Sequence, residues 1–201
     1  MNCTSFRLID GRVRNLTAHF QRLGLNADQE RAARAALRAA PPGASNPLVW
    51  ADGSVRHRPD RSFAPRITVD PIAHLDLRQY PTVKGPDLAW LSERLGISRQ
   101  RGYDEGLLWH HGRIVEGIFS ALITFDGTTA SYSTHPRALS STTLRPVLDY
   151  LAAEGFDLQP VAGFVHVGPL WLLNAFSGVR SAGGPDPAPV NQWLWEQAEE
   201  V

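Results

Sequence analysis

A single lysine, Lys84, is the residue of this chain best suited to covalent chemistry. The 201 residues include twenty basic side chains, of which nineteen are arginine and one is lysine. A preference for arginine and alanine is typical of proteins from GC-rich genomes. A neutral amine can form an imine, however, whereas a guanidinium stays protonated and is a poor nucleophile. Lys84 is therefore either a solvated lysine that opens a helix or an amine nucleophile.

Other reactive residues do not have the spacing of a known kind of site. The one cysteine, Cys3, excludes an internal disulfide and a cysteine-rich zinc site. His110 and His111 are adjacent in an expected turn and would point in opposite directions, so with His135 they predict a solvated turn and no metal site. The G-x-S-x-G turn of a hydrolase and the glycine-rich phosphate loops of Walker or Rossmann type are absent.

The composition indicates a globular protein. Twenty acidic residues balance the twenty basic ones, which argues against a broad electropositive surface for nucleic acid. The hydrophobic share of 43% is enough to build a core. No apolar run reaches the ~18 residues that a membrane span needs, and the N-terminus lacks the apolar region of a signal peptide. We therefore expect a cytoplasmic protein with neither a membrane nor a nucleic-acid partner.

Four turn signals predict antiparallel hairpins. Asp-Gly pairs occupy positions 10–11, 52–53 and 126–127, and His-His-Gly occupies positions 110–112, each between strand-forming segments. Helices are expected at residues 16–23, 28–40, 86–95, 144–154 and 189–200, with Asn15 as the N-cap of the first. The predicted fold class is therefore α+β.

A turn-rich stretch between two sets of strands and helices divides the chain into two lobes. We predict a small N-terminal α/β lobe at residues 1–75, a linker at 76–83, and a larger lobe of antiparallel strands with helices at 84–201. Because clefts between lobes are common places for small-molecule sites, we expect the functional site there.

Five segments, read in order, resemble the class IV aminotransferases, which are fold-type IV pyridoxal-phosphate (PLP) enzymes. This family includes branched-chain and D-amino-acid aminotransferases and aminodeoxychorismate lyase. The segments are TSFRLIDGRVRNLTAHFQRL at 4–23, KGPDLAWLSERL at 84–95, GYDEGLLWHHGRIVEG at 102–117, STTLR at 141–145 and NAFSGV at 174–179. The resemblance covers most of the chain and implies the two-lobed architecture of this family.

The resemblance implies PLP as the cofactor, bound as a Schiff base to Lys84. This lysine would also move the proton between the substrate Cα and C4′ of the cofactor. Glu116, at the end of a strand, would bond the pyridine nitrogen and keep it protonated, because a pyridinium is the better electron sink. Without the resemblance, Glu116 would be interpreted as a surface carboxylate at a hairpin end.

The resemblance also implies residues for the cofactor phosphate. Arg22 matches an arginine whose guanidinium pairs with the phosphate, and Thr142 and Thr143 precede a helix whose N-terminus suits the same anion. Asn174 and Ala175 correspond to the last cofactor loop. On the residues alone, Arg22 is equally a helix-surface arginine and the threonines are equally N-caps.

The chain also departs from the family pattern. Ala89 replaces a tyrosine that in branched-chain enzymes bonds the phenolic oxygen of the cofactor, and Ala121 replaces a frequent asparagine. The segment before the first strand is short.

The activity that the resemblance implies is transamination, or β-elimination as in aminodeoxychorismate lyase. The implied substrate is a small amino acid or an aminochorismate-like compound, and the implied assembly is a homodimer. The alternative is a binding or scaffold protein that has lost the chemistry.

Overall fold

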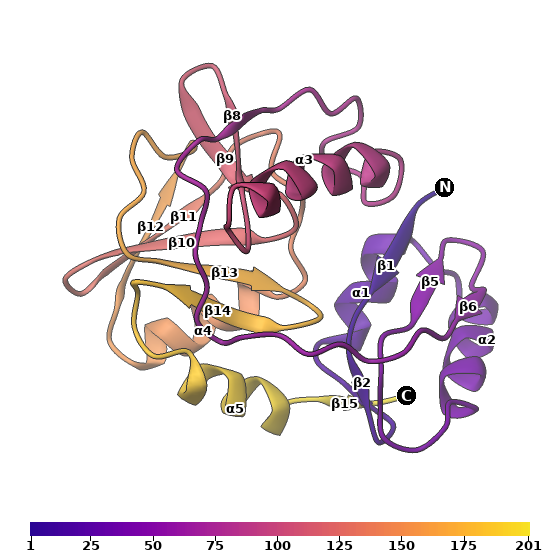
Figure 1. Ribbon diagram of the computed structural model, residues 1–201. Helices are drawn as coiled ribbons and strands as arrows, with labels where there is room; N and C mark the ends of the chain where they lie inside the picture. Colours follow the sequence, from indigo (N-terminus) through magenta and orange to yellow (C-terminus); the bar gives the residue numbers. More distant parts are fainter.

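The computed structural model describes all residues from 1 to 201. Figure 1 shows two groups of elements: the indigo and purple segments on one side, and the magenta to orange segments on the other. The yellow C-terminal segment returns to the indigo group. The mixture of helices with largely antiparallel sheets confirms the predicted α+β class. None of the helices has the length and apolar character needed to cross a membrane.

The first lobe combines two helices with two small sheets. Its helices are α1 (Leu16–Leu23) and α2 (Ala27–Arg38). One sheet has three strands, in the order β1 (Cys3–Ser5), β5 (Leu48–Trp50), β6 (Val55–Arg56). The other sheet has four strands, in the order β15 (Glu199–Glu200), β3 (Arg12–Val13), β2 (Leu8–Ile9), β4 (Ala44–Ser45). Asn26 starts α2 with a capping box, and the buried apolar side chains of the lobe include Phe6, Leu16, Phe20, Leu37 and Val201.

The second lobe is built on a five-stranded sheet. Its strands lie in the order β12 (Asp157–Val161), β11 (Thr129–Ser133), β10 (Ala121–Asp126), β13 (Leu170–Asn174), β14 (Gly178–Ala182). Helices α4 (Leu144–Ala153) and α5 (Ala188–Glu196) share a core with this sheet, with Val147, Leu151 and Val190 among its fully buried members. Burial of these apolar helix faces is the main term that holds the layers together.

A smaller sheet and a helix complete the second lobe. The sheet has the order β7 (His74–Leu75), β8 (Leu107–His110), β9 (Arg113–Gly117), and α3 (Leu88–Gln100) packs near it through Leu91, which shares a small core with Leu108 and Ile118. In Figure 1, α3 lies on the side of this lobe that faces β1 of the first lobe. Lys84 and α3 are thereby placed at the boundary between the lobes.

The four hairpin predictions are confirmed, and the helix predictions hold with shifted ends. Antiparallel pairs β2–β3, β5–β6, β8–β9 and β10–β11 flank the four turns. Helix α3 continues to Gln100, past the expected end at 95. The N-cap expectation for Asn15 is wrong: its side chain makes no cap bond and donates to the Thr142 carbonyl at 2.5 Å. The division at residues 1–75, 76–83 and 84–201 stays a prediction.

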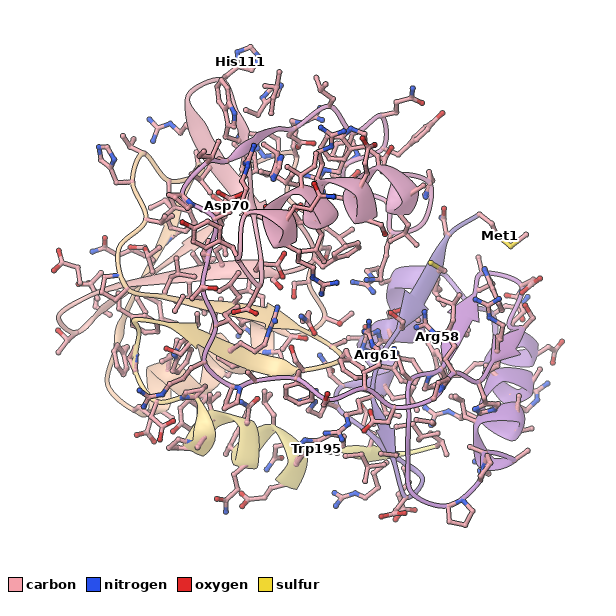
Figure 2. All side chains as sticks on the ribbon, viewed as in Figure 1. Met1, Arg58, Arg61, Asp70, His111 and Trp195 are labelled. Carbon is pink, nitrogen blue, oxygen red and sulfur yellow. The ribbon has the colours of Figure 1, made fainter.

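The two lobes are joined by contacts at both ends of the chain. Cys3 N donates to the Lys84 carbonyl at 2.9 Å. Arg14 of the first lobe stacks over Trp195 of α5 at 4.7 Å, and Figure 2 shows Trp195 at the lower boundary between the lobes. These contacts hold the walls of the cavity between the lobes in place.

Candidate active site

A cavity between the lobes brings together most of the residues singled out in the sequence. Both lobes and the segment before α3 line it. Lys84, Glu116, Arg22, Thr142, Asn174 and Ala175 all lie on its wall, whereas Thr143 does not. The remaining lining residues are Arg78, Pro81, Val83, Gly85, Asp87, Leu88, Leu91, Ile118, Phe119, Ser120, Ala121, Leu139, Ser141 and Leu173. Residues that are up to 153 positions apart in sequence therefore share one site.

Lys84 lies where the chain passes from the loop after β7 into α3. Its backbone is fixed by the hydrogen bond from Cys3, and the next residue, Gly85, has a φ of +145°. A Cβ at Gly85 would overlap the Met1 carbonyl, so only glycine allows β1 to approach the lysine this closely. Burial, followed by the positive charge of Arg22, lowers the pKa of Lys84 to about 8. A substantial fraction of the amine is therefore neutral near physiological pH.

Glu116 lies in β9, is buried and lines the same cavity. Its Oε1 accepts from Arg78 Nη1 at 2.7 Å and from Leu139 N at 3.1 Å, while Oε2 accepts no hydrogen bond from the protein. Burial raises the pKa of Glu116 to about 7, and the Arg78 charge opposes this rise. The carboxylate is thus held by one oxygen, which leaves the other for a donor within the cavity.

Arg78 is a site residue that the sequence analysis missed. It is buried, and it is clamped by Asp76, which accepts from Arg78 Nε and Nη2 at 2.8 Å each. Arg137 Nε donates to the same Asp76 carboxylate at 2.9 Å. A signal was present: His74, Asp76 and Arg78 alternate with apolar residues, and in the structure the polar residues of this alternation point inward.

Arg22 and the turn before α4 form the end of the cavity that is richest in N–H and O–H donors. Arg22 Nη2 donates to Thr4 Oγ1 at 2.8 Å and Nη1 donates to the Ser140 carbonyl at 2.9 Å. Burial lowers the pKa of Arg22 to about 10, so its guanidinium remains charged at neutral pH. Ser141 Oγ, rather than a threonine hydroxyl, accepts from Thr143 N at the start of α4. Arg22, Ser141 and Thr142 therefore face the cavity beside a helix N-terminus, which is an arrangement suited to an anion.

Solved structures of known proteins share this architecture. A structure assigned as a 4-amino-4-deoxychorismate lyase has a TM-score of 0.80 at 20% identity, with 98% of this chain and 88% of that chain covered. A fold IV-transaminase from Curtobacterium pusillum has a TM-score of 0.75 at 15% identity, covering 98% and 84%. The branched-chain amino acid aminotransferase of Escherichia coli has a TM-score of 0.75 at 14% identity, covering 97% and 84%.

The chain has the fold of the fold-type IV PLP enzymes. The resemblance found in the sequence is thereby confirmed at the level of the fold. No protein-family model and no curated protein sequence matches the chain.

The departures from the fold-type IV sequence pattern have visible counterparts in the structure. Ala89 is exposed on α3 and does not line the cavity. Asp87 does line the cavity, but its carboxylate accepts from Gln79 N and Tyr80 N and so fixes the preceding loop.

The fold-type IV loop after β13 is organised by its own asparagine. Asn174 Oδ1 accepts from Phe176 N at 3.1 Å and from Ser177 N at 2.8 Å, and Nδ2 donates to Ser120 Oγ at 3.4 Å. The Asn174 side chain therefore shapes the turn, as Asn commonly does through local bonds to backbone N–H groups. Ala175 also lines the cavity, and its carbonyl accepts from Arg7 N at 3.4 Å and from Arg14 Nη2 at 3.2 Å.

Proposed function

We propose that the protein is a PLP-dependent enzyme that acts on the amino group of a small amino acid or aminochorismate-like substrate. One observation carries the proposal: the only lysine of the chain, with a pKa of about 8, lies in the same cavity as the buried Glu116 carboxylate and the Arg22 guanidinium. A neutral lysine amine is the nucleophile that bonds a cofactor aldehyde. The fold-type IV architecture supports the same cofactor.

The chemistry of the donor set fits the phosphate group of PLP. Arg22 supplies a full positive charge, and Ser141 and Thr142 add hydroxyl groups next to the N-terminus of α4. Charge-assisted hydrogen bonds from a guanidinium suit a phosphate dianion. Thr143, whose side chain lies outside this cavity, would contribute through its position at the start of the helix.

The opposite part of the cavity fits the pyridine ring. Arg78 and Leu139 N hold Glu116 Oε1, and Oε2 would be the oxygen that holds the ring nitrogen. PLP, when bound, supplies an electron sink for the charge that develops at the substrate Cα. The Arg78 charge opposes the rise in the pKa of Glu116 that burial causes, and the ionised carboxylate would favour a protonated ring nitrogen.

Lys84 would have two successive tasks. Its amine would hold the cofactor covalently, and as a free amine it would accept the proton from the substrate Cα and return it elsewhere. A general base works best with a pKa near the working pH, which is the range to which burial brings Lys84. Both transamination and β-elimination use this proton transfer, and the two reactions differ in where the proton is returned and which group leaves.

The test of the proposed function is reduction of the loaded protein. Purified protein is mixed with PLP, treated with borohydride, digested and analysed by mass spectrometry, with Lys84→Arg as the matched control. We expect a yellow protein and a pyridoxyl group on the peptide that contains Lys84. An unmodified Lys84 peptide from PLP-saturated protein would favour the alternative of a binding or scaffold protein.

We also propose that the protein acts as a homodimer. Segment 74–80 lies at an edge of the β7–β8–β9 sheet, and its outward residues Leu75, Leu77 and Tyr80 are exposed at 45%, 64% and 54%. Trp109 of the adjacent β8 is also 36% exposed. This exposed apolar row runs alongside Asp76 and Arg78, and a second copy of the chain would cover it.

A further inference from the structure

His19 connects the first lobe to the phosphate end of the proposed site. It lies in α1 and is completely buried. Its Nδ1 is 2.6 Å from Thr4 Oγ1 in β1, and its Nε2 is 3.2 Å from Thr142 Oγ1 in the turn before α4. Both ring nitrogens are therefore engaged with hydroxyl groups, one in each lobe.

The surroundings of His19 keep its ring neutral. Burial, followed by the positive charges of Arg22, Lys84 and Arg14, lowers the pKa of His19 well below its ordinary value. No carboxylate contacts the ring. A neutral imidazole has one N–H donor and one acceptor nitrogen, so its two hydroxyl partners must play opposite roles.

The hydrogen bonds of Thr4 determine which nitrogen carries the proton. Thr4 is fully buried, and its hydroxyl oxygen already accepts from Arg22 Nη2 at 2.8 Å. If His19 Nδ1 also donated to Thr4, the hydroxyl proton of Thr4 would be buried without an acceptor, which costs about 1–3 kcal/mol. The satisfied arrangement has Thr4 donating to Nδ1, so the proton of the ring is on Nε2.

This assignment fixes the direction of the Thr142 hydroxyl. His19 Nε2–H donates to Thr142 Oγ1, which then acts as the acceptor of that bond. The hydroxyl proton of Thr142 has no acceptor in the protein, and Thr142 lines the cavity. The chain of donors from Arg22 through Thr4 and His19 thus ends in an O–H group that is free to bond an acceptor in the cavity.

We propose that His19 is a positioning residue that fixes the Thr142 hydroxyl as a hydrogen-bond donor to the phosphate of the cofactor. The inference rests on the proposed function, because it takes the anion to be the phosphate of PLP. A phosphate dianion accepts hydrogen bonds and donates none, so it matches a cavity end at which Arg22 and Thr142 both donate. Two side chains of α1 thereby prepare the anion site: Arg22 is itself a donor, and His19 orients the Thr142 hydroxyl as a second donor.

The protonated nitrogen can be observed directly. In protein labelled with ¹⁵N on histidine, long-range ¹H–¹⁵N correlation distinguishes the Nε2–H form from the Nδ1–H form, and the His19 signals are those missing in His19→Asn. We expect the Nε2–H form both without ligand and with PLP. An Nδ1–H ring, or a doubly protonated ring at neutral pH, would overturn the inference.

A double-mutant cycle tests whether His19 acts through the Thr142 hydroxyl. The probes are PLP and pyridoxine 5′-phosphate, which has no aldehyde and so cannot bond Lys84. For each probe, His19→Asn and Thr142→Val should each weaken binding about tenfold, the effect of one lost charge-assisted hydrogen bond. In the Thr142→Val background, His19→Asn should weaken binding less than about twofold. Effects that simply multiply would show that His19 has only a structural role.

Two controls separate failure of this inference from failure of the proposed function. His19→Gln, which retains a side-chain N–H near the position of Nε2, should bind both probes within about threefold of the parent, and thermal melting without ligand reports on folding. Coupling with pyridoxine 5′-phosphate in a protein whose Lys84 is not labelled by PLP would support the anion site and reject the proposed function. If PLP labels Lys84 but His19 and Thr142 show no coupling, the proposed role of His19 is rejected and the proposed function is not.

Discussion

Arg78 Nη1 lies 2.7 Å from Glu116 Oε1, and the two side chains are only 4% and 7% exposed. This ion pair connects the Glu116 carboxylate to a second buried pair, in which Asp76 accepts from both Arg78 and Arg137. Removal of one member of such a network leaves an uncompensated buried charge, whereas an isolated surface pair contributes little. The Arg78 charge in this network therefore opposes the effect of burial on the carboxylate that lines the cavity.

Replacement of Arg78 should be strongly destabilising. We expect Arg78→Met to lower the free energy of unfolding by about 3–5 kcal/mol, because Asp76 and Glu116 lose their buried counter-charge. Urea denaturation of the apo-protein measures this difference. Arg94→Met, which removes an arginine from a part-exposed pair on α3, is the control and should cost less than about 1 kcal/mol. Equal losses for the two variants would contradict the buried network.

The stability of the apo-protein should respond to pH through Glu116. Its pKa is raised from 4.5 to about 7, so the native state binds this proton more tightly than the unfolded state. The contribution is therefore full below about pH 4.5 and is lost as the pH rises through 7. Wild type should lose stability relative to Glu116→Gln between pH 5 and pH 7, as measured by urea denaturation at each pH. If the stability of wild type relative to Glu116→Gln stayed constant or increased from pH 5 to pH 7, the Glu116 carboxylate would be ionised over this whole range.

The solitary lysine allows its own titration to be measured. Reductive methylation with ¹³C-formaldehyde should give one side-chain dimethylamine signal, from Lys84, next to that of the N-terminus. Burial and the nearby Arg22 charge place its pKa at about 8, so the signal should titrate well below the ordinary value of 10.5. The Lys84→Arg variant identifies the signal by its loss. A midpoint near 10 would mean that the amine is solvated.

Arg22→Ala should weaken PLP binding more than it harms folding. The substitution removes the full positive charge beside Ser141 and Thr142, and charge-assisted bonds are worth roughly 1.5–3 kcal/mol. The apparent dissociation constant should therefore rise by about one to two orders of magnitude. A PLP titration measures the change, and Arg99→Ala, an exposed arginine on α3, is the matched control. Unchanged affinity would remove Arg22 from the site.

Disruption of the exposed apolar row should dissociate the proposed homodimer. Leu77 is 64% exposed, so Leu77→Glu adds a charge to this surface without entering a core. Sedimentation at micromolar concentration should give a dimer for wild type and a monomer for the variant. Val165→Glu changes another exposed apolar residue, away from segment 74–80, and should remain dimeric. A monomeric wild type with bound PLP would contradict the proposal.

The parts of the fold that were predictable from the sequence depend on local signals. Asp10-Gly11 adopts positive φ at both residues, as a tight hairpin requires, and the segment between Asn15 and Gly24 forms the expected first helix. The parallel pairing of β12 with β11 and the return of β15 to β3 were not predicted. These pairings join segments that are distant in sequence, and no local sequence pattern specifies the sheet edge with which a strand pairs.

The candidate site was predictable where a family motif contained the residue. Lys84, Glu116 and Arg22 lie on one cavity, as the resemblance implied. Arg78 was missed because its role depends on burial beside Glu116, which is thirty-eight positions away in the sequence. The chain also has nineteen arginines, so the residue type alone does not distinguish Arg78 from the others. The Thr143 side chain lies on a second cavity, which Thr142 also lines, so the part of Thr143 in phosphate binding stays a prediction.

The return of the C-terminal strand has a consequence for synthesis of the protein. Because β15 completes the sheet of the first lobe and Val201 is buried with Phe6 and Leu8, that lobe lacks part of its core until residues 199–201 have been translated. On the ribosome, the five-stranded sheet of the second lobe is therefore made in full while the first lobe is still open. Of the two lobes, the one that begins earlier in the sequence is therefore completed later, because its sheet and its core both need the last residues of the fold.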